Sequence, residues 1–292
     1  MKPARFEYHA PTSVEECLTL LAEYGEDAKV LAGGQSLVPM LALRLAHPEH
    51  LLDVNRIDEL SGSRRENGSL VLGAMTRHVT LESDPGVAAA VPLLARVAPH
   101  IGHFQIRNRG TIGGSLAHAD PAAELPGVVR LLDALIEVDG PSGGRSVPAA
   151  DFFETVFTTA LEPEELLTAV RFPLWGPRAG FAVEQVARRH GDFALVGALA
   201  AAEVDDDGRV ARAALCLTGV DTVPVRREEI EQSLIGAHVS ELDLVGVGAD
   251  AMSDLSPSDD VHASSAYRKQ VGATLASRAL GHAIQEAMRG AK

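Results

Sequence analysis

The chain has 292 residues, of which 46% are hydrophobic and 23% charged, and a formal net charge of −14. This length allows two domains with their own cores, whereas the negative charge argues against nucleic acid or an anionic membrane as the main partner. No stretch approaches the ~20 apolar residues of a membrane span and the N-terminus has no apolar signal core, so we expect a soluble, cytoplasmic protein.

The N-terminal part predicts a small parallel α/β lobe. Ser13 and Glu16 form a capping box in front of a helix. Residues 30–32 then form a short apolar run, residues 37–45 have a helical pattern, and residues 51–54 are apolar again. Strand, turn, helix and strand within about 25 residues is typical of α/β structure.

The middle part changes pattern. Residues 70–72 predict a strand, and residues 81–98 predict helical structure interrupted by two prolines. A helix is expected over residues 122–132 and a strand over 134–138. The segment 172–177 contains two prolines and a glycine and predicts a linker between domains.

The C-terminal part begins with two apolar runs, residues 193–204 and 209–217. They are joined by Asp205–Gly208, and an Asp-Gly pair between apolar runs is a strong β-hairpin signal. Residues 226–288 have a helical pattern with a loop at 256–260. A hairpin followed by helices is therefore expected.

The two cysteines, Cys17 and Cys216, exclude some cofactors from this chain. Two thiols are too few for the four ligands of an iron–sulfur cluster or for a disulfide framework. Cys17 falls in a helical pattern and Cys216 in a strand pattern, so both are expected to be buried. We predict no metal site.

Two glycine-rich segments, Ala32–Ser36 and Thr111–Ser115, carry most of the functional information. Each has adjacent glycines and a hydroxyl residue. Without a Cβ atom, glycines let backbone N–H groups approach an anionic ligand, and two such turns together suit a pyrophosphate. Neither segment has the spacing of a P-loop or a dinucleotide fingerprint. A Gly-Gly pair by itself is equally compatible with a plain turn.

The residues around these segments resemble a known family. The sequences at 31–37, 105–115, 119–122, 157–161 and 189–194 are similar to those of the FAD-binding medium subunit of the molybdenum hydroxylases. That family includes aerobic carbon monoxide dehydrogenase, bacterial nicotine dehydrogenase and the flavin domain of xanthine dehydrogenase. The resemblance extends over nearly the whole chain.

The resemblance implies an α+β fold with two domains. Residues 1–175 would form a two-lobed FAD-binding domain of the PCMH type, with lobes at about 1–55 and 56–175. Residues 178–292 would form a C-terminal domain with a small antiparallel sheet and a helical bundle.

The resemblance also implies non-covalent FAD as the cofactor, with no catalytic acid or base and no metal ligand in this chain. The implied FAD-binding residues are Lys29, Leu31, Ala32, Gly33, Gly34, Gln35, Ser36, Leu37, Thr111, Gly114, Ser115, Asp120, Asp192 and Phe193. Ser115 replaces a common Asn, and Glu124 stands where the family often has Asp.

Several of these residues have a structural alternative. Asp120 is either a cofactor ligand or the N-cap of a helix that begins at Pro121. Phe193 is either a ring beside the flavin or a core aromatic. Lys29 and Leu31, on the strand before the first glycine segment, are either ligands or structural residues. Arg107 and Arg109, before the second glycine segment, either balance phosphate charge or are merely solvated.

The implied function is electron transfer by an FAD-binding subunit. A large molybdopterin subunit would oxidise the substrate, and a small [2Fe-2S] subunit would deliver electrons to the flavin. The flavin would pass them to NAD, a quinone or dioxygen. The alternatives are a self-sufficient flavin reductase of related fold and a non-catalytic nucleotide-binding protein. The substrate is bound elsewhere, so this chain does not specify it.

Overall fold

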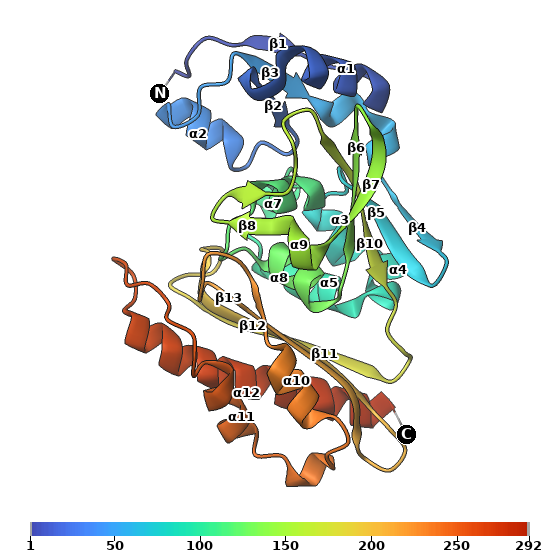
Figure 1. Cartoon of the computed structure of the whole chain (residues 1–292), viewed down its shortest axis with the longest axis vertical. Helices are drawn as coiled ribbons and strands as arrows, with labels where there is room; N and C mark the ends of the chain where they lie inside the picture. Colours follow the sequence, from blue (N-terminus) through green and yellow to red (C-terminus); the bar gives the residue numbers. More distant parts are fainter. Residues whose placement is uncertain (1, 291–292) are drawn as a thin grey trace.

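The computed structural model describes residues 2–290. Figure 1 shows an N-terminal lobe, a middle lobe and a C-terminal domain arranged one after another along the long axis. Each contains its own β-sheet: three, five and four strands in chain order, with an additional two-stranded sheet in the middle lobe. The chain thus consists of two N-terminal lobes and a C-terminal domain with its own sheet.

The N-terminal lobe is a parallel three-stranded sheet with the order β1-β3-β2, as its alternating pattern predicts. The Oγ of Ser13 accepts a hydrogen bond from the Glu16 N–H at 3.1 Å, which confirms the predicted helix start. The elements are β1 Glu7–His9, α1 Val14–Tyr24, β2 Ala28–Leu31, α2 Leu37–Leu43 and β3 His50–Asp53.

The middle lobe contains an antiparallel sheet with the order β4-β5-β10-β6-β7. Its strands are β4 Ser63–Glu66, β5 Ser69–Gly73, β6 Leu135–Gly140, β7 Gly143–Pro148 and β10 Leu166–Pro173. The prediction of a linker over 172–177 is therefore wrong at its start. Phe172 is fully buried and pairs with Leu70, so burial of its ring extends β10 up to the first proline.

Short helices cover this sheet, and the two prolines at 85 and 92 begin helices, as expected for residues without a backbone N–H. The helices are α3 His78–Ser83, α4 Pro85–Ala90, α5 Pro92–Val97, α6 Phe104–Arg107, α7 Ile112–His118, α8 Glu124–Leu131 and α9 Ala149–Phe152. The small strands β8 Phe153–Thr155 and β9 Thr158–Thr159 follow α9.

The C-terminal domain is an antiparallel sheet, β11-β12-β13-β14, between two layers (Figure 1). In β12, Leu199 and Ala201 join the core of the middle lobe, whereas Ala198 and Ala200 join the core beneath α12. Both faces are buried, which explains the uninterrupted apolar run. The elements are β11 Ala179–Ala187, β12 Ala194–Val204, β13 Val210–Thr218, β14 Val225–Arg226, α10 Glu228–Leu234, α11 Leu244–Ala251 and α12 Ser265–Gly290.

Specific polar contacts fasten the C-terminal domain to the middle lobe. Arg96 of α5 forms a two-pronged ion pair with Glu286 of α12, and the same carboxylate accepts the Phe181 N–H at 2.9 Å. Bidentate arginine–carboxylate pairs fix geometry as well as charge. Among the helices in residues 2–290, none is long and apolar enough to cross a lipid bilayer.

Candidate functional site

The structure brings the two glycine-rich segments into contact. A methyl group added at Gly33 would overlap the carbonyl oxygen of Arg109, just before the second segment. A methyl group added at Gly114 would lie 3.5 Å from the Cβ of Ala32. Residues almost 80 positions apart therefore pack backbone against backbone, which only glycine permits at Gly33.

The first segment presents backbone donors that have no partner. It links the end of β2 to α2, and Gly34 adopts a left-handed conformation with φ of 73°. Within residues 2–290, no acceptor is bound to the N–H groups of residues 34–37. Successive N–H groups in such a turn form an anion-binding concavity. Ser36 adds a half-buried hydroxyl at the start of α2.

The second segment is not a turn, as its glycines suggested, but the first turn of helix α7. Thr111 caps this helix, because its Oγ1 accepts the Gly114 N–H at 3.1 Å. The N–H groups of Ile112, Gly113 and Ser115 donate to the carbonyls of residues 76, 74 and 111. This segment engages the N–H groups of residues 112–115 within the protein, so of the backbone donors expected to bind phosphate only the Thr111 N–H has no acceptor within residues 2–290. Its contribution is a close-packed surface at Gly114 and the half-buried hydroxyl of Ser115.

A polar clamp, made of Asp53, Asn55 and Arg77, holds the two segments together. The Nδ2 of Asn55 donates to the Ala32 carbonyl at 2.8 Å, and Arg77 donates to the Oδ1 of Asn55 at 2.7 Å. Arg77 also donates to the Arg109 carbonyl. One chain of hydrogen bonds thus runs from the first segment to the residue before the second.

The charge of Asp53 anchors this clamp. Its Oδ1 accepts from the Asn55 N–H at 2.9 Å, and its Oδ2 accepts from the Tyr8 hydroxyl at 2.7 Å. Burial raises the pKa of Asp53, but the hydrogen bonds from Asn55 and Tyr8 outweigh it and hold the pKa below its usual value. Sequence reasoning missed these residues. The sequence offered one indication of them: Asp53 and Asn55 stand at the carboxyl end of a parallel strand, which is where α/β folds place their ligand-binding sites.

A buried histidine, His78, contacts the start of the second segment. Its Nε2 lies 2.9 Å from the Thr111 carbonyl, and burial lowers its pKa to about 4. The ring is therefore neutral at physiological pH, and Nε2–H is the donor to that carbonyl. This contact fixes the residue that caps α7.

Arg107 is structural and does not point toward a phosphate site. It is buried, forms an ion pair with Glu82 at 2.7 Å, and donates to the carbonyls of Ile101 and Gly102. Through these contacts its guanidinium holds the loop before α6 in place. The alternatives of phosphate balance and simple solvation are both wrong for this residue.

Lys29 and Leu31, on β2, lie at the approach to the first segment. Lys29 is exposed, and Leu31 packs so close to Gly34 that a methyl group there would lie 3.2 Å from its Cδ1. Burial lowers the pKa of His118. The nearby charge of Asp120 opposes this shift, and the charge of Lys29 adds to it. Lys29, His118 and Asp120 therefore belong to one neighbourhood at the end of α7.

Asp120 closes a local turn. Its Oδ1 accepts the Ala122 N–H at 2.9 Å, but α8 begins at Glu124, so Asp120 does not cap a helix starting at Pro121. Glu124 is buried and receives a hydrogen bond from Gln185 at 3.4 Å. Burial raises the pKa of Glu124 to about 7. Its side chain thus belongs to the interface with the C-terminal sheet.

The loop that carries Asp192 and Phe193 comes from the C-terminal domain and contacts His103 of the middle lobe through Gly191. The Gly191 backbone is so close to His103 that a methyl group there would lie 2.7 Å from the imidazole. Nearby, the Gly219 N–H donates to the Pro121 carbonyl at 2.9 Å. Phe193 is 57% exposed, so the alternative of a core aromatic is wrong.

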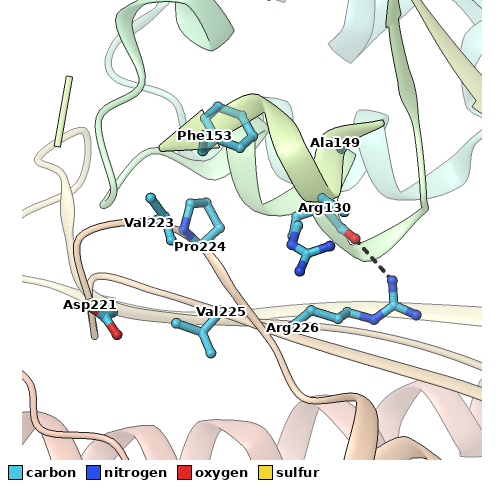
Figure 2. A pocket seen from close by; sticks show the side chains of 9 residues that line it. Arg130, Ala149, Phe153, Asp221, Val223, Pro224, Val225 and Arg226 are labelled. Carbon is cyan, nitrogen blue, oxygen red and sulfur yellow. Dashed lines mark hydrogen bonds between the residues drawn. The ribbon is translucent and has the colours of Figure 1, made fainter. Parts of the chain in front are cut away.

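A cavity of about 250 Å³ lies elsewhere, between α8–α9 and the loop before β14 (Figure 2). Arg226 enters it and is fully engaged: it donates to the Arg130 carbonyl at 3.0 Å, to Leu131, and forms ion pairs with Asp133 and Glu231. None of the expected FAD-binding residues lines this cavity. It houses an interdomain arginine and is not the cofactor site.

The donor set at the two segments fits the pyrophosphate of FAD. It consists of unpaired neutral N–H groups, two hydroxyl-bearing residues and one nearby lysine, which suit an anion held without a metal ion. Because Gly33 packs against the Arg109 backbone, backbone atoms rather than side chains line the site at this contact. By contrast, burial raises the pKa of Cys17 to about 11 and of Cys216 to about 12, as expected for inert core thiols.

Comparisons with known proteins show the family to which the chain belongs. Residues 4–175 match the family described as the FAD binding domain in molybdopterin dehydrogenase, and residues 181–283 match the CO dehydrogenase flavoprotein C-terminal domain. Together these two matches cover nearly the whole chain.

Individual relatives are similar over their full length. The chain is 40% identical to subunit alpha of the 6-hydroxypseudooxynicotine dehydrogenase complex of Paenarthrobacter nicotinovorans, covering 98% of this chain and 97% of that one. It is also 40% identical to the carbon monoxide dehydrogenase medium chain of Hydrogenophaga pseudoflava, with 97% and 98% covered. A solved structure of that organism's carbon monoxide dehydrogenase superposes with a TM-score of 0.94, at 40% identity, over 98% of this chain and 99% of that one.

Proposed function

The chain belongs to the family of FAD-binding medium subunits of multi-subunit molybdenum hydroxylases, and we propose that it transfers electrons through FAD between its partner subunits and an external acceptor. The observation that carries this proposal is the run of N–H groups at residues 34–37, which have no acceptor within residues 2–290 and follow Ala32, the residue that faces Gly114. In this proposal they bind the FAD pyrophosphate.

The remaining cofactor residues surround that contact. Ser115 and Asp120, with Lys29 nearby, would position the ribityl chain, and the exposed Phe193 would cover the flavin ring from the C-terminal domain. Bound FAD supplies a store for two electrons, which iron–sulfur centres can fill singly. The chain's own residues would bind, orient and shield the cofactor, without a catalytic acid or base.

Partner subunits complete the enzyme in this proposal. Cys17 lies in the core of the N-terminal lobe and Cys216, on β13, in the core between the C-terminal sheet and the middle lobe, so they cannot share a cluster. The [2Fe-2S] clusters would lie on a small subunit and the molybdopterin on a large one. Exposed apolar side chains offer docking surfaces, notably Val38 and Leu43 on α2 and Phe104 on α6.

The domain limits are part of the same proposal: an FAD-binding domain at 1–175, with lobes at about 1–55 and 56–175, and a C-terminal domain at 178–292. We further propose a cytoplasmic location and an acceptor that is NAD, a quinone or dioxygen. The acceptor is identified by measuring which of the three compounds reoxidises the reduced complex.

Anaerobic reduction tests electron transfer directly. Dithionite should bleach the flavin of the isolated chain, and an acceptor should restore its colour. Carbon monoxide or an N-heterocyclic substrate should bleach it only after the large and small subunits are added. Turnover by the isolated chain would favour a self-sufficient flavin reductase, and a folded chain that binds nucleotides without redox activity would favour a non-catalytic role.

A further inference from the structure

Three side chains with metal-binding atoms gather on one face of the N-terminal sheet. Glu7 and His9 are two residues apart on β1 and therefore point to the same side. The register of the parallel strands places His50 of β3 beside Glu7. The Nε2 of His9 lies 3.1 Å from the Nδ1 of His50, and the Oε2 of Glu7 lies 3.7 Å from that same Nδ1.

These separations match a tetrahedral metal shell. With bonds of about 2.0–2.1 Å, the ligands of a zinc ion lie about 3.3 Å apart. The three ligand atoms here lie within 4.8 Å of one another. The Glu7 side chain is 74% exposed, so it can rotate to close the remaining gap, while both imidazoles are partly buried and already in place.

The surroundings hold the imidazoles and favour a cation. The Tyr24 ring stacks on His50 with centroids 3.7 Å apart and an angle of 3°, and it lies 5.2 Å from the His9 ring. Within residues 2–290, no lysine or arginine forms an ion pair with Glu7.

We propose that Glu7, His9 and His50 bind a divalent transition-metal cation of the zinc class, with water completing the shell. The ion ties β1 to β3. Because Tyr8, between two of the ligands, donates to Asp53 of the clamp, the ion also steadies the strand that supports the first glycine segment. This site is distinct from the FAD residues, and it does not depend on the proposed electron transfer.

The test is a Zn²⁺ titration of the full-length, metal-free chain, free of any affinity tag, against a chromophoric chelator. One Zn²⁺ per chain is expected. Loss of an outer-shell partner alone costs about 10–100-fold in metal affinity, so His9→Ala and His50→Ala should each weaken binding at least about 100-fold. The matched control is His282→Ala, which removes another histidine 2.9 Å from a carboxylate, Glu184, but without a second imidazole. It should bind like the parent chain.

A second readout keeps the proposal falsifiable if a histidine variant misfolds. Glu7→Gln changes an exposed side chain and should leave the circular dichroism spectrum intact while weakening Zn²⁺ binding. Co²⁺ should give a visible ligand-field spectrum in the parent chain that is lost in Glu7→Gln. Absence of saturable Zn²⁺ binding, or equal binding by the parent chain and the folded Glu7→Gln and His9→Ala variants, would overturn the proposal.

Discussion

The backbone of Gly33 lies directly against the backbone of Arg109, so that any side chain at position 33 would overlap the Arg109 carbonyl oxygen. This contact joins the end of β2 in the N-terminal lobe to the residue pair that precedes α7 in the middle lobe. The same carbonyl accepts a hydrogen bond from Arg77. The two lobes therefore meet at the proposed FAD site.

Gly33→Ala should destabilise the chain. Overpacking against a rigid backbone costs about 1–3 kcal/mol, and here the overlapping atom is a carbonyl that cannot rotate away. Chemical denaturation would measure the loss. The control is Gly281→Ala in α12, where the nearest atom is a flexible Leu244 methyl at 3.3 Å; it should leave the free energy of unfolding equal or slightly higher. Equal stabilities of the two variants would contradict the packing described for Gly33.

Gly114→Ala should weaken FAD binding with a smaller effect on folding. The added methyl group would lie 2.8 Å from the Thr111 Oγ1 and 3.5 Å from the Ala32 Cβ, inside the gap between the two segments. We expect a loss of about 1–3 kcal/mol of FAD affinity, the scale of an unsatisfied buried polar group. Titration of the flavin-free chain with FAD, followed by flavin fluorescence, measures it. Unchanged affinity in a folded variant would return this segment to a purely structural role.

Asn55→Ala should loosen the clamp. It removes the donor to the Ala32 carbonyl and the acceptor for Arg77, leaving both partly buried groups unpaired. The expected cost is about 1–3 kcal/mol of stability, with reduced FAD affinity, because the first segment loses its anchor. Asn108→Ala, at an exposed asparagine near the same loop, serves as the control. The clamp would be unimportant if both variants bound FAD as tightly as the parent chain.

Glu124→Gln should make the chain more stable at alkaline pH. The folded pKa of about 7 lies above the usual 4.5, so the folded chain keeps a proton that the unfolded chain releases. The contribution of Glu124 to the free energy of unfolding is therefore fully present below pH 4.5 and is lost as the pH rises through 7. The neutral isostere should therefore stabilise by up to about 3 kcal/mol at pH 8, and by little at pH 4.5. The exposed Glu164→Gln should show no such pH-dependent difference in urea denaturation.

The sequence predicted elements best where one local signal decided the structure. The Ser13 cap, the prolines that open α4 and α5, and the Asp205–Gly208 turn all act within a few residues. Strand β11 was missed, because its half-buried pattern follows a proline- and glycine-rich segment and gains its partner only when β12 pairs with it.

The site was predicted in part. The glycine segments and their proximity to each other follow from the resemblance and the pattern, but the helical state of Gly113 and Gly114 does not. Glycine disfavours helices, and here the Thr111 cap and the tight contact of Gly113 with Ala74 select the helix. The clamp joins positions 53, 55, 77 and 109, and such a connection depends on how the two lobes pack.

The most direct test of the central claim is the flavin content of the purified chain. Acid treatment should release one equivalent of flavin per chain into solution, and mass spectrometry should identify it as FAD. FAD, unlike FMN, carries the pyrophosphate for which the unpaired N–H groups of residues 34–37 are suited. A folded chain that releases FMN, that keeps its colour in the precipitate through a covalent bond, or that binds no flavin when FAD is supplied would contradict the account.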